Sequence, residues 1–437
     1  EPSRYDADTA YVAVDRHKLD DIKPYVFETH AGGRSWTRID AGLPEGSFVH
    51  AVREDTVKRG LLYAATETGV FVSFDDGRHW QSLQLNLPRT PIHDLVVKDD
   101  DLVAATHGRS FWILDNITPL RQVSAAASAA GVYLYQPAVA HRLYYPDQVD
   151  ARQPAGQNPP AGVMIDYYLP AAATGPLTME IHDNQGGVVR HLSSAKPEQP
   201  EQPPEWPDQV HPVNTLPAAA GMNRFVWNLR YDDPVQIPGA FYAGLPPRGP
   251  IALPGEYTIR LSYAGRTQTA PLILKLDPRV KGPAEGLQQK FALSMEVYRD
   301  QDALHRAVND IQAFKSQLAA TAKSTGGKPA NAALTTESNS LLQQAAQIEA
   351  VLMQVNIKGS EANLNYPGML NEQIYSFAQL LDDADTAPNR PQVDTYAGLH
   401  SRLQTELAAW SDLKKTRIPA LCAHLRDAGQ QPMSACD

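Results

Sequence analysis

The sequence predicts a multidomain chain that is mainly β at first and α-helical in its last third. Three observations predict this order. A short motif recurs within the first 120 residues, prolines alternate with strand-like runs in the middle, and a helical period of apolar residues begins after Glu285. A chain of 437 residues is long enough for about three domains. We expect the domains to span residues 1–122, 123–280 and 281–437.

The clearest copy of the repeated motif runs from Ser73 to Trp80, directly after an apolar strand. Asp75 can accept hydrogen bonds from backbone N–H groups of a turn, and Gly77 can adopt a backbone conformation that a Cβ disfavours. Trp80 offers a large apolar face to a neighbouring sheet. We therefore expect Ser73, Asp75, Gly77 and Trp80 to stabilise a hairpin and its packing, and Asp75 to be a turn residue, not a catalytic acid.

Two weaker copies flank this motif. Gly33 and Trp36 repeat the glycine and the tryptophan, with Trp36 44 residues before Trp80, but Ala31 stands where the aspartate belongs. A third copy repeats the strands over residues 102–115 and lacks the later glycine and tryptophan. Three partial repeats cannot close a ring of sheets, which takes about four to eight. Because the chain also starts at Glu1 without a methionine, we expect further repeats upstream in the same precursor or on a separate chain.

The middle of the chain predicts a β-sandwich with long irregular connections. Nineteen of the 35 prolines lie between Pro146 and Pro254, where they interrupt strand-like runs. We expect six strands, at residues 163–169, 177–181, 188–192, 221–229, 256–261 and 271–276, with a hairpin turn at 183–187. The run from Pro254 to Tyr257, followed by alternation, resembles the closing hairpin of Ig-like sandwiches.

The last third predicts an antiparallel helical bundle. Apolar residues fall on one helical face in each of four segments. These stripes are Leu304, Val308, Ile311, Phe314 and Leu318; Leu341, Ala345, Ile348, Leu352 and Val355; Leu370, Ile374, Phe377 and Leu381; and Tyr396, Leu399, Leu403, Leu407 and Trp410.

Composition excludes several classes of function. The net charge of −10 disfavours a broad attraction to nucleic acid or to an anionic membrane. No apolar run approaches the ~20 residues of a spanning helix, and no motif for a cofactor or a metal ion occurs. Cys422 and Cys436 are the only cysteines. They form either a disulfide, which would indicate an oxidising compartment, or two unrelated thiols.

The motif from Ser73 to Trp80 and the run from Thr106 to Asp115 are followed by a Pro-rich sandwich and a helical tail. This combination resembles the C-terminal part of large bacterial secreted Asp-box (BNR) β-propeller proteins. This family includes proteins labelled glycosyl hydrolases and is similar to sortilin and to xyloglucanases. The resemblance implies partial propeller blades, a secreted or periplasmic location, and a protein that binds glycans or proteins. It leaves open a glycoside hydrolase with upstream catalytic carboxylates, and a sortilin-like subunit that binds peptides or proteins.

No catalytic pair of carboxylates can be assigned from the sequence, so whether the protein is an enzyme stays open. The candidates for a ligand site are His107, Arg109 and Trp112, which surround a glycine after an apolar strand. The alternative is that Arg109 only ties one sheet to the next by pairing with carbonyl or carboxylate groups.

Overall fold

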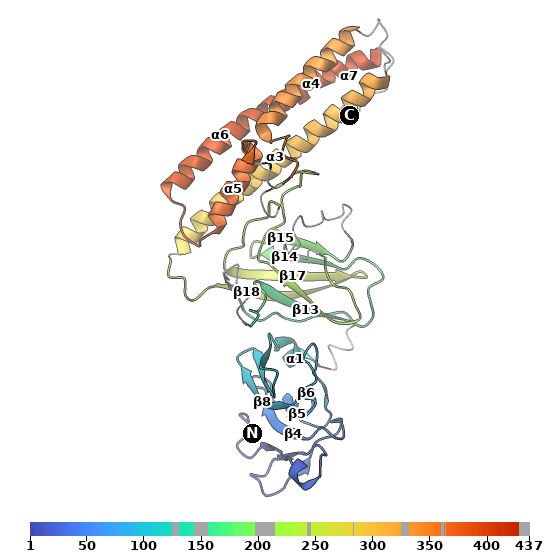
Figure 1. The fold of residues 1–437 in the computed structure, drawn as a ribbon, viewed down its shortest axis with the longest axis vertical. Coiled ribbons are helices and arrows are strands. Elements are labelled where there is room, and N and C mark those ends of the chain that lie inside the picture. The colour runs from blue at the N-terminus through green and yellow to red at the C-terminus, as the bar shows by residue number, and fades with distance from the viewer. Residues whose placement is uncertain are drawn as a thin grey trace.

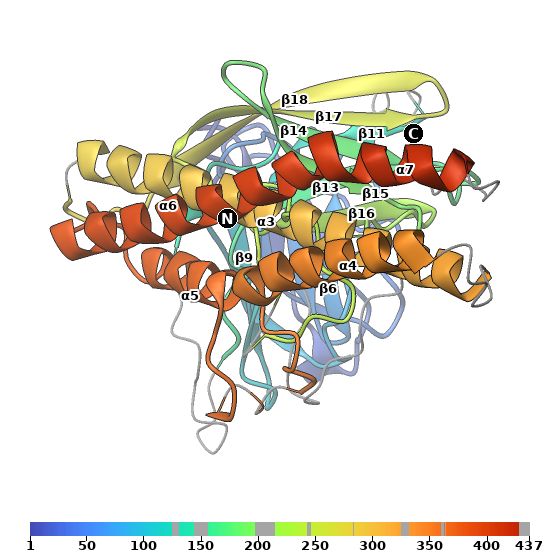
Figure 2. The same ribbon diagram turned by 90° about the horizontal axis from the view of Figure 1, so that it is seen from above.

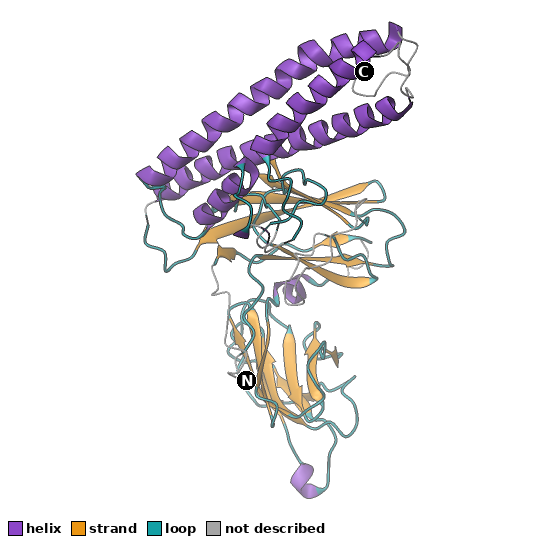
Figure 3. Ribbon diagram, turned by 45° about the horizontal axis from the view of Figure 1, so that its top comes forward, coloured by secondary structure: helices purple, strands orange, loops and turns teal. Residues whose placement is uncertain are grey.

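The structure is a computed structural model that describes residues 1–124, 131–143, 156–196, 215–242, 246–282, 284–324, 332–359, 362 and 364–427. Three parts follow one another along the long axis of the molecule (Figure 1). Small antiparallel sheets form one end, a two-sheet layer lies in the middle, and long helices form the other end. Among the described residues, helix outside that last part is limited to the short helix α1 and a 3₁₀ turn at His17–Leu19 (Figure 3). The predicted order, mainly β and then α, is confirmed.

Three small antiparallel sheets make up the first part. The first contains β1 (Ala10–Ala13), β2 (Val26–Thr29) and β3 (Thr37–Arg38), with the 3₁₀ turn η1 (His17–Leu19) between β1 and β2. The second contains β4 (Val49–Glu54), β5 (Leu62–Thr66), β6 (Gly69–Ser73) and β7 (Gln81–Ser82). The third contains β8 (Ile92–Lys98), β9 (Asp101–Thr106) and β10 (Phe111–Leu114). Each sheet is a meander in which strands adjacent in sequence pair, and α1 (Thr118–Gln122) follows.

The three sheets pack face to face in sequence order. Strand β1 contacts β4, and both β4 and β5 contact β8. One apolar cluster joins the first two sheets and includes Tyr11, Leu62 and Trp80. A second joins the second and third sheets and includes Tyr63 and Leu95. Each sheet therefore uses a face to cover its neighbour.

The middle part consists of two sheets that enclose one apolar core. One sheet has the order β11 (Tyr133–Leu134), β13 (Val163–Leu169), β16 (Gly221–Trp227). The other has the order β12 (Ala140–Arg142), β18 (Arg266–Leu276), β17 (Gly255–Tyr263), β14 (Thr178–Asp183), β15 (Val188–Ser193). In the core, Trp227 meets the edge of Tyr257 with ring centroids 5.6 Å apart. The six predicted strands are present, and β11 and β12 are additional.

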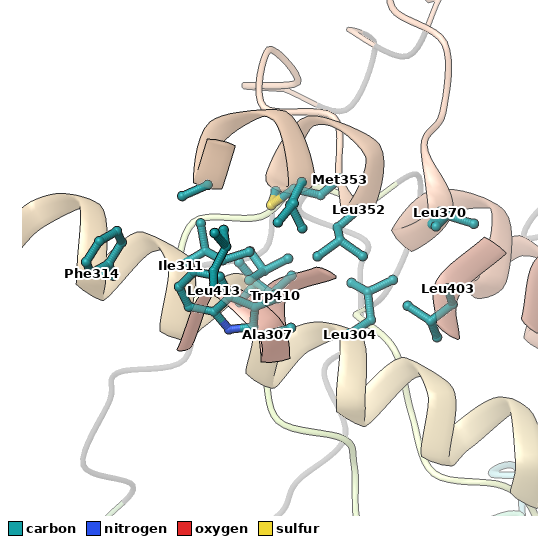
Figure 4. Close-up of a cluster of buried hydrophobic side chains, with 14 of the residues drawn as sticks. Leu304, Ala307, Ile311, Phe314, Leu352, Met353, Leu370, Leu403, Trp410 and Leu413 are labelled. Carbon is teal, nitrogen blue, oxygen red and sulfur yellow. The ribbon is translucent and has the colours of Figure 1, made fainter. Parts of the chain in front are cut away.

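The last part contains α3 (Ala284–Ser324), α4 (Ala332–Leu352), α5 (Leu370–Asp382), α6 (Arg390–Asp412) and α7 (Ile418–Asp427), with a π-helical turn at Leu413–Arg417. Seen from above, these helices lie across the sheets (Figure 2). Leu304, Leu352, Leu403 and Trp410 converge in their shared core (Figure 4). The predicted stripes are buried, except that Leu407 is only partly so and Val355, which follows the end of α4, is 37% exposed. None of the described helices combines the length and the apolar character needed to span a membrane.

Ion pairs fix α1 within the first part, and a hydrogen bond from Arg224 joins the sandwich to the first part. Arg121 on α1 pairs with Asp55 at 3.0 Å and also with Asp100, and so holds α1 against the second and third sheets. Arg224 on β16 pairs with Asp166 and donates to the carbonyl oxygen of Asn116 at 3.2 Å.

Between the sandwich and the helices, Asp385 accepts hydrogen bonds from Arg142 on β12 and from Lys290 on α3. These three side chains are at most 5% exposed. This buried cluster ties the middle of the chain to its last part.

Candidate functional site

The turn after β6 is held by its own side chains. Ser73 Oγ donates to Asp75 Oδ1 at 2.9 Å and accepts from the Gly77 N–H at 2.9 Å, and the His79 N–H donates to Asp75 Oδ1 at 2.9 Å. Burial raises the pKa of the Asp75 carboxyl, but hydrogen bonds from His79 and Ser73 outweigh burial and leave that pKa below its ordinary value. Gly77 has a φ of 83°, which a Cβ would strain. Asp75 is thus an ionised acceptor that organises the turn.

The two tryptophans of the repeat lie in different surroundings. Trp80 is 4% exposed, and its indole N–H donates to the Ile39 carbonyl oxygen in the segment between the first two sheets, at 2.6 Å. Trp36, at the same position of the preceding copy, is 44% exposed. In that copy the Gly33 N–H donates to Thr29 Oγ1 at 3.1 Å, so Thr29 takes the place of Ser73. The first sheet therefore forms the turn, but within the described residues its tryptophan lacks a neighbouring sheet to cover it.

Five aromatic rings form a row that crosses the second and third sheets. Neighbouring ring centroids lie 4.8–5.0 Å apart along the order His17, Phe48, His50, His93, His107. We call these five side chains the ring row. His50 lies on β4, His93 on β8, and His107 directly after β9. The ring row thus joins the two sheets through the first strand of each.

Two β-bulges place His50 and His93. On β4, Val49 pairs with Thr66 and Ala51 with Ala65, so that His50 is left between two ladder pairs. On β8, Ile92 pairs with Thr106 and Asp94 with Ala105, which leaves His93 in the same position of the next sheet. A bulge redirects the side chain of its extra residue and is common beside functional sites. The repeat therefore presents one imidazole per sheet at matching positions.

The two ends of the ring row differ in the hydrogen bonds of their imidazoles. Nδ1 of His17 lies 2.7 Å from Oδ1 of Asp15, and Nε2 of His50 lies 3.0 Å from Oε2 of Glu67. Burial raises the pKa of the Asp15 carboxyl, but backbone and side-chain hydrogen bonds from His17 outweigh burial and leave that pKa below its ordinary value. Across the described residues, the ring nitrogens of His93 and His107 make no hydrogen bond, and both residues are exposed. These imidazoles are free to donate to or accept from a ligand.

The other predicted ligand residues separate in the structure. Arg109 is exposed beside His107, whereas Trp112 is partly buried in the apolar cluster between the second and third sheets, and its indole N–H donates to the Arg109 carbonyl oxygen at 3.0 Å. The structure thus brings His107 into the ring row and gives Trp112 a packing contact.

Cys422 is buried on α7 and carries no free thiol. Cys436 lies outside the described residues, so the pairing of the two cysteines stays a prediction.

A cavity in the last part is a second candidate ligand site. It has a volume of about 650 Å³ and lies between the segment after β16 and helices α5 and α6, with Tyr242, Glu372 and Tyr375 in its lining. The rings of Tyr242 and Tyr375 are 4.9 Å apart. Burial raises the pKa of the Tyr242 hydroxyl, which lies 3.3 Å from Nε2 of His305.

Sequence reasoning found His107 but missed the other four rings of the row. The spacing offers a signal, because His50 and His93 are 43 residues apart and so follow the period of the repeat. Each of the two histidines lies on the first strand of its sheet and directly follows a buried residue, a valine or an isoleucine. That pattern marks equivalent positions on successive sheets.

No protein-family model matches this chain, and no curated protein matches it in sequence. Solved structures that are similar over part of the chain include the following two. An ancestral GH74 enzyme is 12% identical, with a TM-score of 0.21, over 43% of this chain and 26% of that enzyme. The extracellular domain of a protein described as a hybrid two-component system from B. thetaiotaomicron is 8% identical, with a TM-score of 0.19, over 59% of this chain and 29% of that domain. The matched regions thus span less than a third of either protein.

Proposed function

We propose that the first part of the chain is a run of consecutive β-propeller blades and that its ring row binds an extended neutral glycan outside the cytoplasm. The observation that carries the proposal is the placement of His50 and His93 at the same bulge of successive sheets, in line with His107. In a β-propeller, the first strands of neighbouring blades meet around a common axis. Residues at equivalent positions of these strands can therefore form one row that binds a ligand.

The chemistry of the ring row favours hydroxyl groups as ligands. Imidazole nitrogens can donate or accept according to tautomer, and carboxylates at Asp15 and Glu67 accept. A sugar hydroxyl both donates and accepts, so it can satisfy either kind of partner. Ring steps of about 5 Å repeated along the row extend the surface beyond one small molecule. An oligosaccharide, with hydroxyls repeated along its length, fits this arrangement.

Uncovered apolar faces at both ends of the stack support further blades. On the third sheet, Val96, Phe111 and Ile113 are 50–74% exposed, and Val103 pairs with both Val96 and Ile113, which puts these side chains on one face. On the first sheet, Val12 and Trp36 are 37% and 44% exposed. We propose that sheets of the same repeat cover both faces, either upstream in the precursor or on a separate chain. A contiguous exposed apolar patch commonly marks such an interface.

The location rests on a separate observation. Cys422 is buried and carries no free thiol, and disulfides persist in secreted and periplasmic proteins but are rare in a reducing cytosol. This supports a secreted or periplasmic protein, in line with an extracellular glycan as the ligand.

Calorimetric titration with neutral oligosaccharides of glucan, xyloglucan and mannan tests the proposal on the full chain. We expect at least one of them to bind, and the double variant His93→Ala/His107→Ala to weaken that binding at least tenfold, which corresponds to about 1.4 kcal/mol. Both side chains are exposed, so the variant should keep its fold by circular dichroism.

Two control variants locate the ligand. His424→Ala removes an exposed histidine on α7 that pairs with Glu337, and it should bind normally. Tyr242→Ala alters the cavity of the last part. Absence of binding across the panel contradicts the proposal, as does binding that is lost in Tyr242→Ala and kept in the double variant. Chromatography of the bound oligosaccharide after incubation separates binding from cleavage, and cleavage would favour a glycoside hydrolase.

A further inference from the structure

A second cluster of polar side chains, apart from the ring row, joins the first sheet to the second. Glu28 lies on β2, His30 directly follows that strand, and Asp76 lies in the turn after β6. One ligand atom from each of the three lies within 4.8 Å of the others. Glu28 and His30 are close in sequence, but Asp76 comes from the next sheet and lies far along the chain, which is why no sequence motif indicates the cluster.

The hydrogen bonds around His30 fix the direction of its lone pair. Thr9 Oγ1 donates its single hydrogen to Asp6 Oδ2 at 2.7 Å, because a carboxylate can only accept. The hydrogen bond between Thr9 Oγ1 and His30 Nδ1, at 2.8 Å, must then be donated by the imidazole. In a neutral His30 the hydrogen is therefore on Nδ1, and Nε2 has a free lone pair.

That lone pair faces a carboxylate that lacks a donor. Nε2 of His30 lies 3.4 Å from Oε2 of Glu28, and this oxygen is buried without a hydrogen-bond partner. Two facing electron pairs repel unless a proton or a cation lies between them. A proton on His30 or on Glu28 would remove this repulsion, and so would a bound cation.

Asp76 supplies the third ligand and is itself oriented. Its φ of 63° is in the left-handed region, and its backbone N–H donates to the Gly60 carbonyl oxygen at 3.0 Å. The Tyr11 hydroxyl donates to Oδ1 at 2.5 Å, which leaves Oδ2 available. Outer hydrogen bonds of this kind, from the imidazole of His30 to Thr9 and from Tyr11 to Asp76, are the usual support of metal ligands.

We propose that Glu28, His30 and Asp76 bind a divalent transition-metal ion, with Zn²⁺ as the best match, which links the first sheet to the second. One imidazole and two carboxylates suit Zn²⁺, whereas Ca²⁺ and Mg²⁺ prefer oxygen ligands throughout. Zn²⁺ binds such N and O atoms at about 2.0–2.2 Å, so small side-chain movements suffice to close the site. Water completes the coordination, because the His30 side chain is 49% exposed.

Titration of the metal-free full chain with ZnCl₂, followed by calorimetry and by metal analysis after desalting, tests this site. We expect tight binding that is weakened at least tenfold in His30→Ala and in the nearly isosteric Glu28→Gln. The matched control is His424→Ala, since His424 pairs with Glu337 at 2.8 Å and no third ligand joins this pair among the described residues. Binding in this control should equal that of the wild type. Thermal unfolding should show a zinc-dependent increase in melting temperature that both site variants lose.

Several outcomes would overturn the site. They are the absence of stoichiometric zinc binding, binding that His30→Ala leaves unchanged, and a folded Glu28→Gln variant with wild-type affinity. Nuclear magnetic resonance that shows His30 doubly protonated at neutral pH in the presence of excess ZnCl₂ would also overturn it, because a proton would then occupy the place of the metal. Tighter binding of Ca²⁺ than of Zn²⁺ would contradict the proposed metal class.

Discussion

Replacement of Trp80 by alanine should cost far more stability than the same change at Trp36. Both residues occupy the same position of the repeat, but Trp80 is 4% exposed and Trp36 is 44% exposed. Truncation of a buried tryptophan typically costs about 3–5 kcal/mol. Trp80→Ala also leaves the Ile39 carbonyl oxygen without its indole donor. We expect a loss of about 3–5 kcal/mol for Trp80→Ala and about 1 kcal/mol or less for Trp36→Ala.

Native-state hydrogen exchange is the appropriate assay, because a chain of three parts need not unfold in one step. Amides of β6 and β7, which flank the turn, should lose protection in Trp80→Ala, whereas those of α3 and α6 should not change. Equal losses in the two variants would refute the reasoning, since the difference is assigned to the neighbouring sheet. Unchanged protection of β6 in Trp80→Ala would refute it as well.

The remaining predictions concern the last part of the chain and its junction with the sandwich. Asp385→Ala should destabilise the chain by about 3–5 kcal/mol in calorimetric unfolding, because it leaves Arg142 and Lys290 buried without their carboxylate. Burial raises the pKa of Asp385, but hydrogen bonds and charge from Arg142 and Lys290 outweigh burial and hold that pKa below its ordinary value. The contribution of Asp385 to stability is therefore present above about pH 4 and is lost as the pH falls toward the folded-state pKa. In urea unfolding, the stability advantage of the wild type over Asp385→Asn should shrink in acid, and a constant difference would contradict this. Leu304 has no exposed surface, so Leu304→Ala should cost about 2–5 kcal/mol in thermal unfolding, whereas Val355→Ala, at 37% exposure, should cost less than about 1 kcal/mol. Comparable losses in the two variants would show that the apolar stripe of the helices does not define the core.

Periodicity predicted the elements that bury one continuous face. The stripe from Leu304 to Leu318 is buried because a helix brings every third or fourth residue to the same side. Val355 fits the spacing of the second stripe in the sequence, but α4 ends at Leu352. A residue beyond the end of a helix no longer lies on the apolar face of that helix. The π-helical turn at Leu413–Arg417 and helix α7 also escaped prediction, because the apolar pattern alone does not show where a helix is interrupted and resumed.

The candidate sites could be predicted only where local spacing carries the information. The Ser73 turn is local, since its hydrogen bonds join residues within four positions. The spacing of His50 and His93 marks equivalent positions of the repeat, but the contact between their rings depends on bulges and on the packing of β4 against β8, which the spacing does not show. Likewise Asp76 reaches Glu28 and His30 only after two sheets have packed together.

Hydrogen exchange of the full chain, with and without the oligosaccharide that binds best, tests the central claim most directly. The account predicts ligand-dependent protection in the segments that contain His50, His93 and His107, with no change around Tyr242 and Tyr375. Protection confined to the cavity near Tyr242, or no protection at any of the three histidine segments, would contradict the assignment of the ring row as the ligand-binding surface.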